Sequence, residues 1–432
     1  MKKFLIVLIF LAFWQATLAQ QEPTAPKYGI SFSGFVKNDF FVDTRDCYTI
    51  REGHFLLYPK EVATDSDNID INDKTSFNFL SIQTRLSGKI TAPDAFGAKT
   101  SGVLEADFFG NENTNFTDNN GFRLRHAIVK LNWKKTELLS GQYWHPFFIP
   151  SCFSGVISFN TGVPMQPFSR NPQIRLTHNM GKFGVMAAVA AQRDFTSPTG
   201  SAVLRFSAVP DISAGISYET KNEYAKTGFL IGAVAGYKML QPVRTITVGS
   251  SAYVTNAKVQ GYSATVYMKA TLKPLIIKMQ GVYGQNLFDL LMLGGFAVHE
   301  ITDPLRQTVN YTTINNMAVW TEFETRGEKI QAALWAGYTR NLGSNLSILN
   351  YSNTASGTES TVRGSNLLSV FRVSPRLVFI RGNFNLATEC ELTRACYASQ
   401  TNGTLNRNEF GVITDFYSVH NVRVLLSVIY KF

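Results

Sequence analysis

Glu389 and Glu391 carry the carboxylate groups that acid and base catalysis would need. Paired carboxylates can divide these two roles in hydrolysis. In an extended strand, however, side chains two positions apart lie on one face as neighbours. We therefore interpret both as charges on the wall of a sheet.

Motifs for other enzymatic chemistry are absent from the sequence. Six His are present, yet no HExxH, GxSxG or CxxC occurs. His126 and His145 flank expected strand ends, where a structural role is the simpler interpretation. We predict that the protein is not an enzyme and uses no cofactor.

Four Cys raise the question of disulfides or a metal site. Cys390 and Cys396 stand six positions apart on one expected strand, about 20 Å apart, which is too far to pair. Cys47 and Cys152 fall in two expected loops and could form a disulfide or remain free thiols. Since the four Cys do not form two close pairs, no metal site is predicted.

The elements that must position these residues are strands. In the last residues, Val422, Val424, Leu426, Val428, Tyr430 and Phe432 alternate with Asn421, Arg423, Ser427 and Lys431. Similar alternation recurs near 80–90, 173–178, 211–218 and 262–272. Recurring segments of about ten residues with one apolar and one polar face are typical of transmembrane β-barrels. The strands of a soluble sandwich are usually shorter.

Composition and the N-terminus agree with an exported, all-β chain. Of 432 residues only 17% are charged, and no amphipathic helix is evident after the first twenty. Lys2 and Lys3 precede an apolar run, and small residues precede Gln20, so we expect a signal peptide at 1–19 and a barrel at 20–432. Without Lys2 and Lys3, the balance of 39 Lys and Arg against 31 Asp and Glu is +8. With no long basic run, this predicts contact with anionic lipid or solutes and no nucleic acid.

We count sixteen expected strands in the sequence. They predict an all-β fold, a transmembrane antiparallel barrel in which short turns lie at one end and long loops at the other. Fourteen or eighteen remain possible, because 245–254 and 409–415 could be strands or hairpins above the membrane. The expected strands lie near 29–43, 75–92, 98–110, 121–133, 136–145, 171–180, 182–192, 209–219, 226–239, 256–271, 273–285, 309–324, 328–341, 366–381, 385–398 and 418–432.

Charges on the expected inner face could tune a water-filled lumen. Arg85 would face Glu105 or Asp107, and Arg376 would face Glu389 or Glu391. Such ladders can set ion selectivity, or they can be salt bridges that only satisfy a polar wall. The other cations assigned to this face are Lys89, Arg175, Lys269, Lys278, Arg372 and Arg423. At most a mild anion preference is expected.

Residues 146–170, the third long loop, are unusually apolar for an outer loop. They include Phe147, Phe148, Phe153 and Phe159. The loop could fold into the lumen as a constriction, dock on a partner, or pack on its own barrel rim. The segment 287–298 raises the same question, and its Gly294 and Gly295 indicate a sharp reversal.

The chain resembles porin-type outer-membrane barrels of Gram-negative bacteria. The resemblance rests on the terminal Val428, Tyr430 and Phe432, and on SFSGFVKNDFF (31–41), GQYWHPFF (141–148) and GVYGQNLFDLLMLGG (281–295). A more distant likeness is to phosphate-selective porins, which have a similar G-x-F-x-x-P-F junction before the third loop. This third loop lacks the charged cluster that a phosphate channel would need, so phosphate selectivity is not expected.

The resemblance implies an outer-membrane channel of sixteen strands, often a homotrimer, with the third loop folded inward. It implies contact with outer-membrane lipid and lipopolysaccharide, and insertion by the barrel assembly machinery through the terminal aromatic residues. We expect a passive diffusion channel for small hydrophilic solutes. The alternative is a docking or assembly subunit of an outer-membrane complex, which the two apolar loop segments would favour.

Overall fold

The structure is a computed structural model that describes residues 28–109, 121–357 and 360–432. The signal peptide expected at 1–19 lies outside the described residues. Within the described ranges, no helix is long and apolar enough to cross a bilayer.

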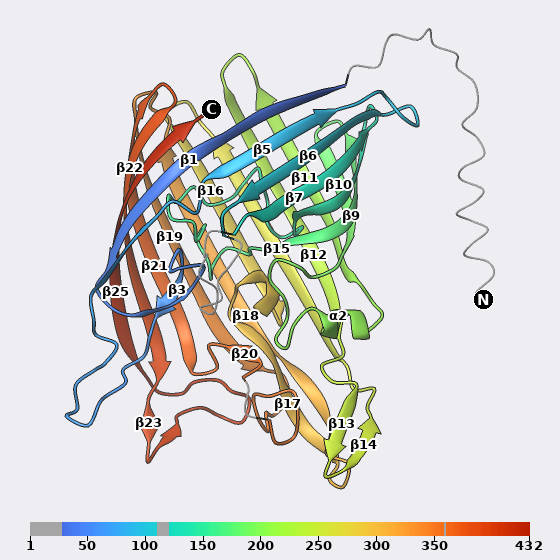
Figure 1. Cartoon of the computed structure of the whole chain (residues 1–432), viewed down its shortest axis with the longest axis vertical. Coiled ribbons are helices and arrows are strands. Elements are labelled where there is room, and N and C mark those ends of the chain that lie inside the picture. The colour runs from blue at the N-terminus through green and yellow to red at the C-terminus, as the bar shows by residue number, and fades with distance from the viewer. Residues whose placement is uncertain (1–27, 110–120, 358–359) are drawn as a thin grey trace.

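Antiparallel strands close into a barrel with sixteen wall positions, which confirms the predicted fold class and count. Figure 1 shows the C-terminus and the short turns at one end and the long loops at the other. The wall strands are β1 (Gly29–Asp43), β4 (Ser76–Leu80) with β5 (Arg85–Thr91), β6 (Lys99–Asp107), β7 (Arg123–Asn132), β8 (Thr136–Trp144), β9 (Arg170–Met180), β10 (Phe183–Ala190), β11 (Asp211–Asn222), β12 (Thr227–Leu240), β15 (Val259–Thr271), β16 (Leu275–Gln285), β18 (Thr308–Thr325), β19 (Ile330–Ser344), β21 (Leu367–Arg381), β22 (Phe384–Ala398) and β25 (Phe416–Lys431).

The remaining elements belong to the long loops. They are β2 (Cys47–Ile50), β3 (Phe55–Pro59), α2 (Ala202–Phe206), β13 (Thr245–Val248), β14 (Ser251–Val254), the 3-10 turn η1 (Phe288–Leu290), β17 (Gly294–Asp303), β20 (Val362–Arg363), β23 (Gln400–Thr401) and β24 (Thr404–Leu405). Residues 245–254 form a separate hairpin, β13–β14. Residues 409–415 contribute one isolated bridge, between Arg407 and Ile413. Neither segment adds a wall strand.

Tight turns join neighbouring strands at the end that carries the C-terminus. Gly181 between β9 and β10 has φ +69°, and Gly382 between β21 and β22 has φ +57°. Both values lie in the left-handed region, which glycine adopts without the steric cost that a Cβ atom brings. These two glycines therefore let the chain reverse within two residues.

Alternation along β25 sets the outer and inner faces of the wall. Val424, Leu426 and Tyr430 are exposed on the outside, whereas Arg423 and Ser427 are buried inside. The same arrangement recurs on other strands, for example with Ile174 and Leu176 outward on β9 and Leu104 outward on β6. A closed barrel is one of the two structures that can cross a bilayer, because pairing of every strand edge satisfies the hydrogen bonds of the backbone. An apolar exterior suits contact with lipid. The chain therefore has the fold of a transmembrane β-barrel.

One predicted strand is interrupted. The segment 75–92 forms two pieces, β4 and β5, which both pair with β1 but are separated by a turn at residues 81–84. The turn reverses the phase of the alternation, so that Phe77 and Phe79 point outward before it and Leu86 after it. Ile82, predicted to share the outer face with Leu86, is instead buried in the core.

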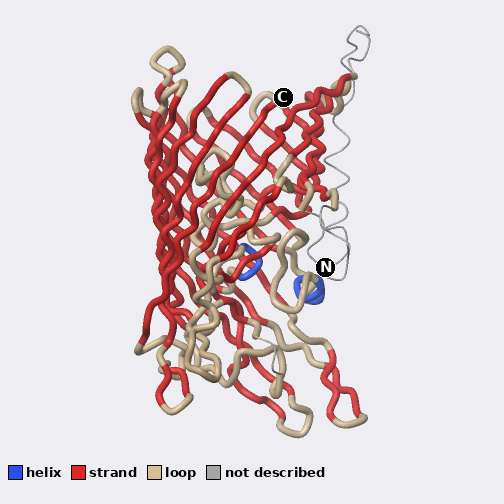
Figure 2. The backbone as a smooth tube through the Cα atoms, turned by 60° about the vertical axis from the view of Figure 1, so that its left-hand side comes forward, coloured by secondary structure: helices blue, strands red, loops and turns tan. Residues whose placement is uncertain are grey.

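The hydrophobic core lies inside the barrel. Figure 2 shows loop segments running within the ring of strands. One buried cluster joins β3, the third loop and the segment around η1 to apolar residues on the inner wall, including Trp320 and Trp335. The lumen is therefore packed by the protein's own long loops.

Candidate functional site: a lumen packed by three loops

The third loop, residues 145–169 between β8 and β9, lies within the barrel. Phe147, Phe148 and Phe159 are buried, and Phe153 remains 40% exposed while it stacks on Phe148 at 5.5 Å between ring centroids. Because most of these rings are buried, the loop does not expose to water the apolar side chains that are unusual for an outer loop. Of the three sequence-based alternatives, the structure shows the inward fold.

Wall carboxylates hold the backbone N–H groups of this loop. Gly155 N donates to Glu322 Oε2 at 3.0 Å, and Ile157 N donates to Glu389 Oε2 at 2.6 Å. A third contact runs from Asn160 Nδ2 to Glu391 Oε1 at 2.5 Å. These three glutamates therefore fix the position of the loop by accepting hydrogen bonds from it.

Donors from the wall hold the carbonyl groups of the same loop. Lys37 Nζ donates to Ile157 O at 2.7 Å, and Arg372 Nη1 donates to Val163 O at 2.8 Å. The amide of Gln280 donates to Phe147 O at 3.0 Å. The loop is thus held by carboxylates on its N–H groups and by cations and amides on its carbonyls. We refer to these wall residues as the loop clamp.

Two further loops complete the packing. Every residue of β3 is buried, and Arg372 Nη2 donates to Leu56 O at 2.9 Å and to Leu57 O at 3.0 Å. In the sixth loop, Asp289 is buried against Lys238 of the wall, and Leu290 O accepts from Phe168 N at 2.9 Å. The inward loops therefore contact one another as well as the wall.

Arg376 pairs with different carboxylates from those predicted. Its register partner on β22 is Glu389, as expected, but its ion pairs are with Glu322 and Glu324 of β18. The strand between them, β19, places the small Ala333 opposite both Arg376 and Glu324. Because Ala333 leaves space, the Arg376 side chain reaches across β19, while Glu389 binds the third loop.

The Arg85 ladder is present, but a denser cluster lies beside it. Arg85 Nε is 3.7 Å from Glu105 Oε1, whereas Asp107 pairs with Arg123 and Arg125 at 2.8 Å each. The sequence interpretation missed both arginines. Their alternation with an outward Leu124 was the available signal, although a β-bulge beside Glu105 shifts the phase of β7.

Arg170 and Asp194 extend this cluster toward the long-loop end. Arg170 Nη2 lies 2.7 Å from Asp194 Oδ2, and its guanidinium lies 5.0 Å from the ring centroid of Trp144. Burial alone would raise the pKa of the Asp194 carboxyl, but Arg170, Arg123 and Arg51 hold that pKa below its ordinary value. Asp194 therefore stays ionised among the arginines. Neither residue was singled out from the sequence.

The other predicted wall cations differ in what they contact. Arg423 is buried and forms a bidentate ion pair with Asp43, and Lys278 forms ion pairs with Glu322 and Glu324. Arg175 is half-buried and donates to Trp144 O at 2.6 Å and to Gln173 Oε1 at 3.0 Å. Within the described residues, no carboxylate lies within ion-pair distance of Arg175, Lys269 or Lys89. Lys269 lines a small cavity at the short-turn end, and Lys89 is exposed near that end.

The cysteines remain as four free thiols. Cys152 Sγ donates to Met268 O at 3.2 Å on the inner wall, and burial raises the pKa of its thiol to about 11. Cys47 donates to Arg45 O at 3.3 Å. Of the two alternatives for this pair, the structure shows free thiols.

Replacing Arg372 tests the loop clamp. Arg372→Ala removes four hydrogen bonds, three of them to β3 and the third loop, and one of the two cations of Glu391, which keeps Arg423 at 4.0 Å. Losing one partner of a buried charged set typically destabilises by about 3–5 kcal/mol. We expect faster protease cleavage within 145–169 and a lower unfolding temperature. Arg381→Ala is the matched control on the same strand, because Arg381 is exposed at the rim. Equal cleavage of the two variants would contradict the clamp.

Comparison with known proteins yields structural neighbours only. No family model matches the chain, and no curated protein matches it. Among solved structures, it is similar to OmpT, an outer membrane protein of Vibrio cholerae, at 11% identity and a TM-score of 0.52, over 94% of this chain and 98% of that one. It is equally similar to an anion-selective porin from Comamonas acidovorans, at 11% identity and 0.52, over 94% and 100%.

OmpF of Salmonella typhi, solved in complex with daunomycin, matches at 11% identity and a TM-score of 0.50, over 93% of this chain and 97% of that one. At these identities the likeness concerns the fold. The chain has the fold of a porin-type outer-membrane barrel, as its sequence resemblance implied.

Proposed function

We propose that the protein is an outer-membrane diffusion channel for small hydrophilic solutes, whose opening is set by the third loop. The observation that carries this proposal is the loop clamp. A polar inner wall holds a loop across the lumen through its backbone. Such an arrangement limits the size of a passage without any chemical step.

Exposure of the inner wall supports a passage along one side of the barrel. Beside the third loop, Glu322 and Glu391 are 0% exposed, so water is excluded there. On the side of β5–β9, Lys130 is 25% and Glu137 is 30% exposed, and Arg85 and Arg175 are half-buried. The hydrated inner residues thus follow the short strands β5–β9, which is where we place the solute path.

Charge along this path supports a mild anion preference. Lys130 pairs with Glu137 and Arg85 with Glu105, whereas Arg175 on β9 and Lys89 on β5 have no ion pair among the described residues. One structural neighbour is an anion-selective porin. Two uncompensated cations give a weak field in a hydrated passage, so the preference is small.

The alternative of a docking subunit loses the observation that motivated it. It was based on apolar segments at 146–159 and 287–298. Most of the apolar side chains in both segments are buried within the protein, in the lumen or in clusters among the long loops. We therefore favour the channel.

A reversal-potential measurement tests the proposal. Purified protein in a planar bilayer under a salt gradient should give discrete conductance steps and a small anion preference. Arg175→Glu should shift the reversal potential toward cations, because it reverses one of the two charges that lack an ion-pair partner on the proposed path. Arg381→Glu is the control, since it makes the same charge change at the exposed rim of the short-turn end. Folded protein that gives no steps at any voltage would contradict the channel, and equal shifts in both variants would contradict the proposed path.

A further inference from the structure

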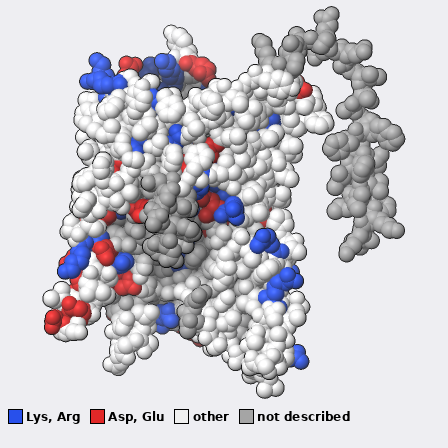
Figure 3. Space-filling view, in the orientation of Figure 1, with Lys and Arg blue, Asp and Glu red and all other residues white. Residues whose placement is uncertain are grey.

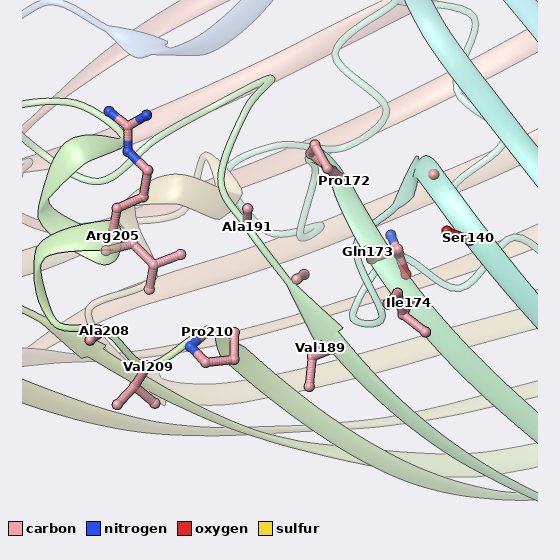
Figure 4. A pocket seen from close by; sticks show the side chains of 13 residues that line it. Ser140, Pro172, Gln173, Ile174, Val189, Ala191, Arg205, Ala208, Val209 and Pro210 are labelled. Carbon is pink, nitrogen blue, oxygen red and sulfur yellow. The ribbon is translucent and has the colours of Figure 1, made fainter. Parts of the chain in front are cut away.

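The outer face of the wall carries a hollow where β8–β11 meet the loop that contains α2. Its volume is about 590 Å³, within the range of about 300–1,000 Å³ that small-molecule sites occupy. Figure 4 shows Ile174, Val189, Val209 and Pro210 around it, with Arg205 on the loop at its rim. We call it the outer hollow.

The hollow lies on the membrane-facing side of the wall. Ile174 and Val189 are 55% and 41% exposed on the outer face of β9 and β10. The surrounding strands are short, with 8 residues in β10 against 18 in β18. Small residues such as Ala191 and Ala208 at the ends of these strands leave space below the loop. The hollow is thus a gap in the apolar exterior.

Its position along the barrel places it in the leaflet on the long-loop side. β9 begins at Arg170, β10 ends at Ala190 and β11 begins at Asp211, all at the end where the long loops emerge. Ile174 and Val189 lie within a few residues of these strand ends. Long loops of outer-membrane barrels are extracellular. The hollow therefore faces the outer leaflet.

Basic side chains gather at the rim without acidic ones. The loop segments 195–210 and 241–258 carry Arg205, Arg244 and Lys258 and contain no Asp or Glu. The Arg244 guanidinium lies 5.1 Å from the ring centroid of Phe206, and Lys258 Nζ donates to Ser207 O at 3.1 Å, so both cations lie beside α2. The nearest acidic residue in sequence, Asp211, is buried beside His145. Figure 3 shows that basic side chains predominate on this side of the molecule, over α2 and toward β13–β14.

We propose that the outer hollow binds a phosphorylated acyl lipid of the outer leaflet, with an acyl chain in the hollow and a phosphate at Arg205, Arg244 and Lys258. An apolar cavity directly below a group of cations complements a molecule with an apolar chain attached to an anionic head. Basic residues at a membrane surface attract such heads by Coulombic interaction. An acyl chain in the hollow fills a gap that would otherwise remain at the barrel surface. Each CH₂ group that packs there adds stabilising contacts.

A second copy of this chain fits the hollow less well. The rim is cationic, and the chain as a whole carries +10, so two copies that meet at this surface would bring like charges together. The convex wall of another barrel would also leave a concave cavity unfilled, whereas a flexible acyl chain fills it. Charge complementarity and shape therefore favour the lipid.

Native mass spectrometry of the folded barrel in non-ionic detergent tests this site. The probes are lipid A with both phosphates, the same lipid after dephosphorylation, and inorganic phosphate. We expect wild-type protein to retain lipid A, to retain the dephosphorylated lipid more weakly, and not to retain free phosphate. Replacing two rim cations, in Arg205→Gln with Arg244→Gln, should weaken lipid A binding about fivefold for each cation.

A filled hollow tests the acyl part of the site. Ala191→Trp should abolish retention, whereas Ala187→Trp should not, because Ala187 is an exposed alanine on the same outer wall but outside the hollow. The exposed rim cations provide an independent readout should Ala191→Trp fail to assemble. Equal retention by wild type and the double Arg variant would overturn the proposal. So would equal retention of the two lipid forms, or a dimer that Ala191→Trp disrupts while lipid binding persists.

Discussion

Replacing residues 147–159 with a short Gly-Ser linker is expected to raise the conductance of the channel several-fold. This segment carries Phe147, Phe148 and Phe159, which are buried inside the barrel, so its removal empties the middle of the lumen. Conductance follows the width of the water-filled path, and a path now confined to the side of β5–β9 would widen toward β18–β25. Single-channel recording in a planar bilayer measures the change directly.

The barrel should survive this deletion. Its wall is closed by strand pairing alone, and the deleted segment contributes no wall strand. The clamp carboxylates Glu322 and Glu389 would lose their N–H donors, but they would gain water in the widened lumen. Shortening the β13–β14 hairpin is the control, because that hairpin lies outside the wall. Unchanged conductance after removal of 147–159 would mean that solutes do not pass beside this loop.

The same deletion should reduce the effect of Arg175→Glu. A low-dielectric segment opposite a charge strengthens the field of that charge, because fewer water molecules screen it. Arg175 lies on β9 near the exit of the third loop, where Trp144 O at the end of β8 and Gln173 Oε1 on β9 accept hydrogen bonds from its guanidinium. Once the apolar segment is gone, water surrounds the site, and the charge reversal should shift the reversal potential less than in the intact channel.

The wall could be predicted from the sequence because each strand carries its own signal. Polar and apolar side chains alternate over ten or more residues, and the alternation is imposed by the bilayer outside and by the polar interior. The signal failed at residues 81–84, where a turn shifts its phase and turns Ile82 inward. A local phase change of this kind has no marker in a short window of sequence.

The loop clamp could not be predicted, because its contacts join distant parts of the chain. Glu389 is 232 residues from Ile157, and Glu322 is 167 residues from Gly155. The partners on the loop are backbone N–H groups, which every residue except proline carries, so no residue type marks them. The apolar composition of the loop indicated burial, but it did not decide whether the loop packs in the lumen, on a partner or on the barrel rim. Only the closed barrel decides among them.

Arg376 illustrates the same limit for side chains. Its strand register with Glu389 follows from the turn at residues 382–383, and Glu389 is one of the two partners that the sequence left open. Its ion pairs with Glu322 and Glu324 depend on a small residue, Ala333, on the strand between them. Which carboxylate a long side chain reaches is thus decided by the size of its neighbours, across strands that lie far apart in sequence.

Deleting Phe432 is expected to lower the amount of assembled barrel strongly while export continues. Phe432 closes the seam between the two ends of the wall, since its N–H donates to Gly34 O at 3.1 Å and its carbonyl accepts from Gly34 N at 3.0 Å. The register of the seam places Lys431 opposite Phe35. Phe432 and Tyr430 are exposed on the outer surface, and Val428 is half-buried there, as a lipid-facing terminal signal requires.

The glycine at position 34 makes this contact specific. A Cβ atom at Gly34 would lie 2.9 Å from the Phe432 ring and 2.2 Å from Arg85 O, so the seam has no space for another side chain. Deletion therefore removes two hydrogen bonds and the ring that packs on Gly34. Heat-modifiable migration on a gel measures the folded fraction, and Phe432→Tyr is the conservative control. The deletion leaves the other β1–β25 pairs intact. If those pairs alone were enough to close the barrel, a stable seam would form without Phe432. An undiminished folded fraction after the deletion would show that they are, and that the terminal aromatic residue is not needed for assembly.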